Sequence, residues 1–202
     1  QLMPLAQEMA SLSARLAIQP FQAQELVSHM RLDLAPTELT QLHTVVAWTA
    51  ALQTQLPQLS TAELLPVTRE LTAMPSFELS QLTQVFDAHH LTLEPMRLAQ
   101  LSETLQFSAA LQRELPALSV AQLLPMTQEL MDASQSAVSS QQPAVIQELF
   151  SRHQLALEPP QLSRLTDTLV TAQTLSQYIP QLSRAELLPV AYFHLVFTLS
   201  HE

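Results

Sequence analysis

The chain has 202 residues, 47% of them hydrophobic, and a formal net charge of −10 at pH 7. Glycine and cysteine are both absent, which excludes glycine-rich phosphate-binding loops, nucleophile elbows, disulfides and thiolate metal sites. All eight cations are Arg, and eight Arg against eighteen carboxylates disfavour a phosphate-binding surface. Asn, the other common helix terminator, is missing too, so a chain rich in Leu, Gln, Ala and Glu is expected to be all-α. No run of about eighteen uncharged apolar residues occurs, so we expect no membrane span.

An internal repeat organises the chain. The segment LPQLSTAELLPVTREL at 56–71 returns as LPALSVAQLLPMTQEL at 115–130, identical at 11 of 16 positions, and in part as IPQLSRAELLPV at 179–190. Between them, LTLEPMRLAQLSETL at 91–105 matches LALEPPQLSRLTDTL at 155–169. The sequence therefore predicts a composite repeat of about 59–64 residues, with copies at about 1–55, 56–114 and 115–178 and a partial copy at 179–202.

Each repeat is predicted to hold four short helices, near 60–74, 78–90, 95–105 and 107–115 in the best-defined copy. A capping box opens the first helix, with Ser60 three residues before Glu63. Glu94 and Pro95 open the third, because Pro is favoured at the first helical position. A recurring LLP motif places Pro66 about six residues past the cap, which predicts either a kinked helix or a short turn after which the true helix begins.

Residues 132–143, DASQSAVSSQQP, are predicted to be a loop because they are small and polar. The last segment, AELLPVAYFHLVFTLSHE, predicts a helix that is apolar on all sides. Solenoids need polar terminal caps to stay soluble, so an uncapped apolar helix indicates either that more chain follows or that a partner covers it. We expect other protein subunits to cover this helix, through Tyr192, Phe193 and Phe197. Residues 1–9 begin at an LLP motif and not at its cap, so we expect a segment of a longer chain or a tightly bound subunit.

Histidine offers the best raw material for metal or acid–base chemistry. His89 and His90 close a predicted helix, and His153 occupies the position of His89 in the next copy. An imidazole in the last turn is stabilised by the negative end of the helix dipole, and this is the interpretation we favour over a metal ligand or a pH switch. His43 and His194 lie among apolar residues and are predicted to be core histidines.

No further pattern indicates a site for catalysis, a metal or a cofactor. His29 and Asp33 form an i, i+4 pair suited to share a cation. Glu8, Glu70 and Glu129 repeat at one helical position, which fits a solvated face or a ladder for a basic partner. No Ser lies in a glycine turn that would expose it as a nucleophile, and we expect no enzymatic activity.

The spacing LSxxxLLPVxxEL, then LxLEPxxLxxLxxTL, resembles the degenerate two-helix repeats of the octotricopeptide, RAP and FAST-kinase-like group. That resemblance implies an α-solenoid that binds RNA in mitochondria or plastids, or one recruited as a structural subunit of an organellar complex. Generic armadillo- or HEAT-like scaffolds give nearly the same pattern. The Arg residues do not keep register between copies: Arg69 overlays Gln128, and Arg97 overlays Gln161. A modular RNA code needs that register, so RNA is the less favoured partner.

Together these patterns predict a right-handed α-solenoid of degenerate helical hairpins, forming one domain over 1–202. We interpret the protein as a non-enzymatic, intracellular scaffold that mediates protein–protein contacts in a larger assembly, with a mitochondrial location implied by the resemblance. The alternative is an RNA-binding segment of an organellar α-solenoid.

Overall fold

The structure, a computed structural model, describes residues 36–136 and 142–199. The chain forms two compact units, Gln1–Leu101 and Ser102–Glu202, and the boundary between them falls inside one helix. The single domain expected from the sequence stays a prediction.

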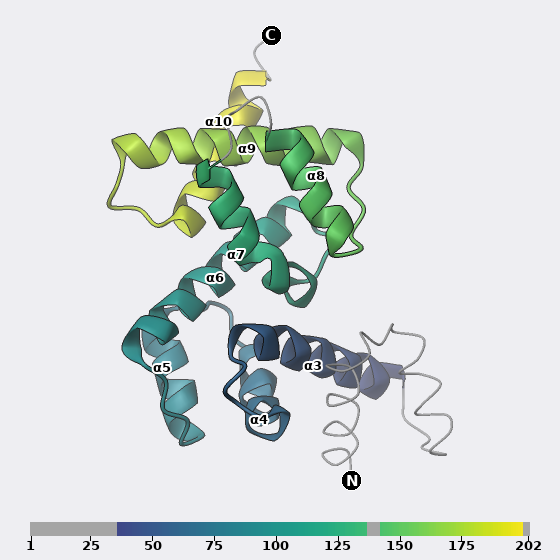
Figure 1. The fold of residues 1–202 in the computed structure, drawn as a ribbon, viewed down its shortest axis with the longest axis vertical. Helices are drawn as coiled ribbons and strands as arrows, with labels where there is room; N and C mark the ends of the chain where they lie inside the picture. The colour runs from purple at the N-terminus through teal and green to yellow at the C-terminus, as the bar shows by residue number, and fades with distance from the viewer. Residues whose placement is uncertain (1–35, 137–141, 200–202) are drawn as a thin grey trace. The chain divides into compact units, whose positions relative to one another are not determined.

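The described residues are all-α, as predicted: they form eight helices and no strand (Figure 1). The helices are α3 (Pro36–Gln55), α4 (Thr61–Leu71), α5 (Leu79–Ala88), α6 (Pro95–Glu114), α7 (Val120–Ser136), α8 (Gln142–Arg152), α9 (Pro159–Tyr178) and α10 (Arg184–Leu199). They repeat as a long helix, a middle helix and a short helix: α3–α4–α5, then α6–α7–α8, then α9–α10. Residues of α3 and α4 correspond to those 59 positions later, and residues of α5, α6 and α7 to those 64 positions later.

The prediction of four helices per repeat is wrong, because the expected helices at 95–105 and 107–115 are one continuous helix, α6. Gln106 stands between them and is tolerated inside a helix, and neither Gly nor Pro interrupts the segment. The predicted loop at 132–143 is also shorter than expected, since α7 continues to Ser136 and α8 begins at Gln142.

The predicted helix starts are confirmed. Ser60 Oγ accepts from the backbone N–H of Glu63 at 3.3 Å, and the Glu63 carboxylate accepts from the Ser60 N–H at 2.8 Å. The side-chain hydrogen bond from Ser60, together with a smaller effect of its backbone N–H, holds the pKa of Glu63 below its ordinary value. Ser183 and Glu186 repeat this capping box at α10. Pro66 lies inside α4, so the alternative in which the helix begins at this proline is wrong.

Two helices end with a left-handed residue that is not glycine. His90 (φ 56°) follows α5, and Gln154 (φ 58°) follows α8 at the equivalent position. Next to His90, the Leu91 N–H donates to the Phe86 carbonyl at 2.9 Å, and the His90 N–H donates to the Asp87 carbonyl at 3.0 Å. These are the two hydrogen bonds of a Schellman motif, which Gly or Asn usually completes. The chain contains neither, so His and Gln take the strained position.

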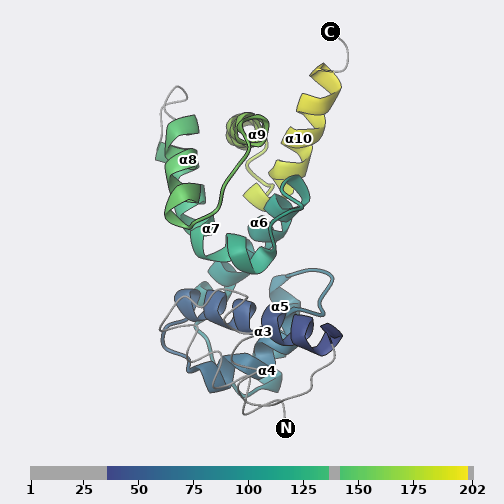
Figure 2. The same ribbon diagram turned by 90° about the vertical axis from the view of Figure 1, so that its right-hand side faces the viewer.

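In the first unit, α4 packs against both α3 and α5. Leu52, Leu64 and Leu82 are fully buried there, and the Trp48 and Phe77 rings pack with their centroids 5.8 Å apart. In the second unit, α9 lies between α8 and α10 and contacts both (Figure 2). One apolar cluster links α6, α7, α8, α9 and α10, with Phe107, Phe150 and Leu187 among its buried members. Each unit therefore has its own core.

Buried hydroxyls pair between the long and middle helices of the first two groups. Thr49 Oγ1 lies 3.2 Å from Thr68 Oγ1, and Ser108 Oγ lies 2.7 Å from Thr127 Oγ1 at the equivalent positions. Ser108 and Thr127 each also contact the backbone carbonyl four residues earlier, at 2.8 and 2.9 Å. The two hydroxyl groups thus take part in three short oxygen–oxygen contacts, one with each other and one with each backbone carbonyl.

The third group has Ala172 and Ala191 at these two positions, and both are buried. A single buried hydroxyl without its partner costs more than an apolar pair of similar shape. The two positions are therefore polar together or apolar together in each group.

Candidate partner-binding surface

Helix α10 presents one face to α9, and no other helix of the described residues packs extensively on its opposite face. Its buried residues, Ala185, Leu187, Leu188 and Ala191, lie on the α9 side within the apolar cluster of the second unit. The last turns of α10 project beyond α9 in both ribbon views (Figures 1 and 2). The helix is apolar on both faces, as predicted, yet only one face packs against a described helix.

The three predicted partner-binding residues all lie on α10. Phe193 and Phe197 are 63% and 52% exposed, and their rings pack with centroids 4.4 Å apart at 44°. Tyr192 is partly buried. Contiguous apolar patches on a protein surface commonly mark interaction sites, so this exposed aromatic pair is a candidate contact for a partner.

Four of the exposed side chains of α10 form a stripe at i, i+3, i+4 and i+7, which is the spacing of one helix face, and Val196 beside them is 42% exposed. This α10 stripe consists of Val190, Phe193, His194 and Phe197. Val190 is 44% exposed and was missed by sequence reasoning, because it is apolar like its equivalents Val67 and Met126, which are buried. The prediction of a buried core histidine at His194 is wrong: the side chain is exposed, because no described helix covers this face.

A second set of residues joins the middle and short helices in the first two groups. His89 Nε2 lies 2.9 Å from Glu70 Oε1, and His153 Nε2 lies 3.6 Å from Glu129 Oε1. Arg152 adds an ion pair to Glu129 at 3.0 Å. The repeated Glu and the repeated His were noticed separately in the sequence, and their pairing was missed because it depends on how α5 and α8 pack. The His89–Glu70 hydrogen bond joins the end of α5 to α4, whereas His153 Nε2 approaches Glu129 without a hydrogen bond and Arg152 makes the ion pair there.

The described residues contain no group of three or more His, Cys, Asp and Glu side chains placed to share a metal ion. The predicted i, i+4 pair of His29 and Asp33 lies outside the described residues, as does Glu8. His43 is partly buried in α3. No metal or cofactor site is assembled within 36–136 and 142–199.

Glu114, the last residue of α6, is the titratable side chain whose environment is most unusual. Desolvation raises its pKa to about 7, although the nearby Arg164 charge acts in the opposite direction. Its Oε2 atom is buried and has no hydrogen-bond partner among the described residues. The end of a helix also carries a partial negative charge, which disfavours a carboxylate there. The charged form of the Glu114 carboxyl is thus disfavoured where α6 ends.

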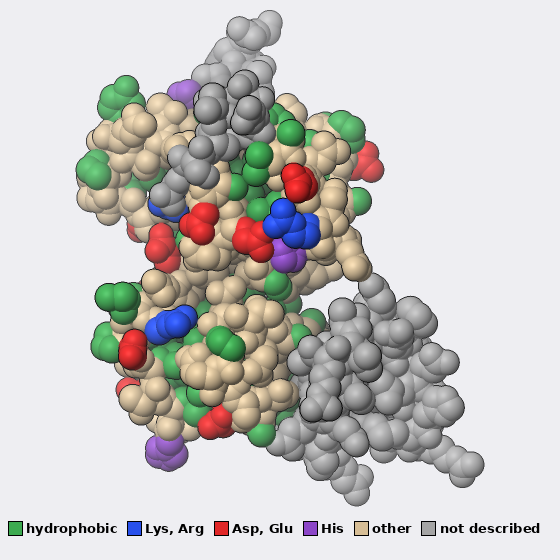
Figure 3. Space-filling view, in the orientation of Figure 1, with side chains coloured by type: hydrophobic (Ala, Val, Ile, Leu, Met, Phe, Trp, Pro, Cys, Tyr) green, Lys and Arg blue, Asp and Glu red, His purple; other side chains and the backbone are tan. Residues whose placement is uncertain are grey.

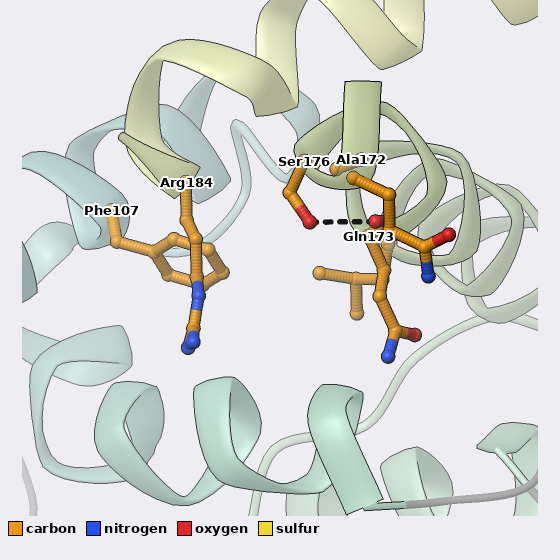
Figure 4. A pocket seen from close by; sticks show the side chains of 7 residues that line it. Phe107, Ala172, Gln173, Ser176 and Arg184 are labelled. Atoms are coloured by element: carbon orange, nitrogen blue, oxygen red, sulfur yellow. Dashed lines mark hydrogen bonds between the residues drawn. The ribbon is translucent and has the colours of Figure 1, made fainter. Parts of the chain in front are cut away.

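The second unit has a pocket of about 290 Å³ between α6, α9 and α10 (Figure 4). The aromatic and aliphatic parts of its lining are Phe107, Leu169 and Ala172; the polar parts are Gln173, Ser176, Gln177 and Arg184. The Arg184 and Gln173 side chains extend in the same direction in Figure 4, and the Ser176 hydroxyl donates to the Gln173 carbonyl at 2.6 Å. The lining has no carboxylate, imidazole or thiol, so it contains no general base or nucleophile pair.

This pocket arises from a change within the repeat. In the first group Gln53 occupies the position of Ser176, and its side-chain amide donates to the Leu59 carbonyl in the loop between α3 and α4. Ser176 is too short to reach the corresponding loop, which leaves space between α9 and α10. The short Ser176 side chain is one of the residues that line this space.

Charged side chains are scattered over the described surface. The visible face in Figure 3 shows one cluster in which red, blue and purple side chains touch, and otherwise scattered charges, with no continuous run of Arg among the described residues. No helix within the described ranges is long and apolar enough to cross a membrane.

No family is identified by comparison. The sequence matches no model of a protein family, and no characterised protein or solved structure is similar to it. The geometry of α10 is therefore the main guide to function.

Proposed function

We propose that this chain is a non-enzymatic helical-repeat scaffold that mediates protein–protein contacts as a subunit of a larger assembly. The observation that carries the proposal is the α10 stripe, an exposed apolar face on a helix whose opposite face is packed in the core. Removing such a face from water stabilises a complex by about 25 cal/mol per Å² of apolar area, before the costs of association.

The repeat supports the rest of the proposal. We propose that the α3–α4, α6–α7 and α9–α10 hairpins stack as a right-handed α-solenoid over one domain, within a longer or tightly assembled protein. The resemblance to octotricopeptide, RAP and FAST-kinase-like repeats, or to armadillo- and HEAT-like scaffolds, supports the same architecture and suggests an intracellular, mitochondrial location. It also supports the alternative function, an RNA-binding solenoid segment, which the net charge of −10 disfavours.

Affinity purification of the protein from its own cells, followed by size exclusion and the 260/280 nm ratio of the peak, tests the proposal. We expect a nucleic-acid-free complex with one or a few stoichiometric proteins. The Phe193→Ser/Phe197→Ser variant should lose those proteins. The matched control, Leu79→Ser/Met96→Ser, removes exposed apolar side chains from the other unit and should keep them.

Two results would contradict the proposal. Bound RNA that is released at high salt would establish the alternative function, because phosphate contacts weaken steeply with salt. Equal loss of the co-purifying proteins in the test and control variants would show that α10 is not their binding surface.

A further inference from the structure

The α10 stripe has a counterpart on each of the other middle helices. Positions i, i+3, i+4 and i+7 of the stripe correspond to Val67, Glu70 and Leu71 in α4 and to Met74 just after its end. In α7 they correspond to Met126, Glu129, Leu130 and Ala133. The three helices share the capping Ser and the internal Pro that fix this register. The same face of the repeat can therefore be compared in three environments.

On α4 and α7 this face is covered. Val67 and Leu71 have no exposed surface, and the same is true of Met126 and Leu130. The equivalents in α10, Val190 and His194, are both exposed. All three middle helices follow a long helix in a hairpin, so the long helix does not account for the difference.

The covering element on α4 and α7 is the short helix. α5 packs on α4, and α8 packs on α7. The i+3 position of the stripe marks the contact directly, because Glu70 reaches His89 at the end of α5 and Glu129 reaches His153 at the end of α8. Among the described residues, α10 has no short helix of this kind.

We propose that the α10 stripe binds a short amphipathic helix of a partner protein, seated as α5 is on α4 and α8 is on α7. This rests on the proposed function, in which α10 is a protein-binding surface. The partner helix carries apolar residues at i, i+3 and i+4 and a Leu at i+9, as α5 does with Leu82, Val85, Phe86 and Leu91. α8 shows the same spacing at Ile146, Leu149, Phe150 and Leu155.

The stripe also specifies one difference from α5 and α8. Both short helices place His at i+7, where it meets a Glu of the middle helix. In α10 that Glu is replaced by Phe193. The exposed ring offers apolar contact and no carboxylate, so the partner helix carries an apolar residue at i+7 in place of His.

A second copy of this chain is a poor source for the partner helix. Phe86 of α5 and Phe150 of α8 are each 1% exposed, so either helix would have to leave its own core to bind elsewhere. Exposing a buried Phe costs about 1.5–3 kcal/mol, which opposes the exchange. The α5 and α8 helices of a second copy are therefore unfavourable occupants of the α10 stripe.

Two fluorescein-labelled peptides test the proposal against the intact chain. Both carry the sequence of residues 142–157, with an i, i+4 staple at the exposed positions 147 and 151 to hold the helix, and one carries His153→Leu. Fluorescence anisotropy at pH 6 should show the His153→Leu peptide binding about tenfold more tightly than the His peptide, which corresponds to about 1.4 kcal/mol.

The Phe193→Glu variant restores the residue found in α4 and α7, and it should reverse this order. Met96→Glu, at an exposed side chain of the other unit, is the matched control and should leave the order unchanged. A thermal melt followed by circular dichroism confirms that each variant is folded. A third peptide with Leu149→Ser/Phe150→Ser should not bind.

Several outcomes would overturn the inference. Equal affinity for the two peptides, or the same order in Phe193→Glu, would show that position 193 does not face i+7 of the helix. Absence of peptide binding, in a protein that still loses its co-purifying partner in the Phe193→Ser/Phe197→Ser variant, would leave the scaffold function intact and exclude a helix of this type. A concentration-dependent dimer in light scattering that Phe193→Glu abolishes would identify a second copy as the occupant.

Discussion

Replacing His90 by Gly should stabilise the protein, although glycine usually weakens folded chains. His90 follows α5 with φ 56°, and its backbone N–H and that of Leu91 complete the Schellman hydrogen bonds. A residue with a β-carbon pays about 1–2 kcal/mol in this left-handed conformation. Glycine removes that strain while the two hydrogen bonds remain.

The expected gain is the difference between two effects. Glycine increases the conformational entropy of the unfolded chain, which costs about 0.5–1 kcal/mol. Subtracting this from the relief of strain leaves a gain of about 0–1.5 kcal/mol, centred on about 0.75 kcal/mol, in the free energy of unfolding. His90 is exposed, so its side chain gives up little packing. For a chain of this size, 1 kcal/mol raises Tm by about 2–4 °C.

Trp48 provides the assay. It is the only Trp in the chain, it lies in the first unit with His90, and it is 6% exposed, so its fluorescence reports the unfolding of that unit. In urea titrations His90→Gly should raise the midpoint, whereas His90→Ala keeps the β-carbon and should not. A midpoint unchanged by Gly, or raised equally by Ala, would refute the strain argument.

Gln154→Gly, at the equivalent position of the second unit, extends the same experiment to the domain organisation. It should raise the stability of the second unit for the same reason. If the chain is one cooperative domain, as the sequence predicts, Gln154→Gly will also raise the Trp48 midpoint. A shift confined to far-UV circular dichroism would contradict the single-domain prediction.

Three further predictions concern buried and capping groups. Ser108→Ala and Thr127→Val should each lower the free energy of unfolding by about 1–2 kcal/mol in urea titrations. The double variant should lower it by less than the sum of the two, because no buried hydroxyl is then left without its partner. Additive losses would refute the coupling. The pKa of Glu114 is raised to about 7 in the folded state, so the protonated side chain favours folding at low pH and this contribution is lost as the pH rises through 7. Glu114→Gln should therefore stabilise the protein more at pH 8 than at pH 5 in thermal melts. An equal effect at both pH values would contradict the assignment. Ser60→Ala should lower Tm at pH 7 and have a smaller effect near pH 3. The pKa of Glu63 is lowered in the folded state, so its capping carboxylate stabilises the fold above the unfolded pKa and loses this effect when it is protonated. A pH-independent effect would show that the carboxylate plays no part.

The local features of the fold could be read from the sequence. Ser60 and Ser183 cap helices where predicted, and Pro95 and Pro159 begin α6 and α9, because these effects depend on residues three or four positions apart. The continuity of α6 could not be read with the same certainty, since Leu spacing alone does not distinguish one long helix from two short ones. No breaker separates residues 105 and 107, and that absence carried more information than the spacing.

The features of the candidate surface that were missed depend on long-range packing. Glu70 and His89 are 19 residues apart, and only the packing of α5 on α4 brings them to 2.9 Å. His194 was predicted to be buried because its sequence neighbours are apolar, but burial depends on whether another helix covers that face. The repeat held a usable signal: Leu71 and Leu130 stand where His194 does, so the polar replacement indicates that this face is used differently in the third group.

The paired buried hydroxyls limit how the three groups can be exchanged with one another. A chimaera that places α9 against α7 would set Ala172 beside Thr127, and one that places α6 against α10 would set Ser108 beside Ala191. Either recombinant would leave one buried hydroxyl facing a methyl group, even though the sequences of the copies are similar. A long helix and its middle helix are therefore expected to be exchanged between copies together, as a whole hairpin.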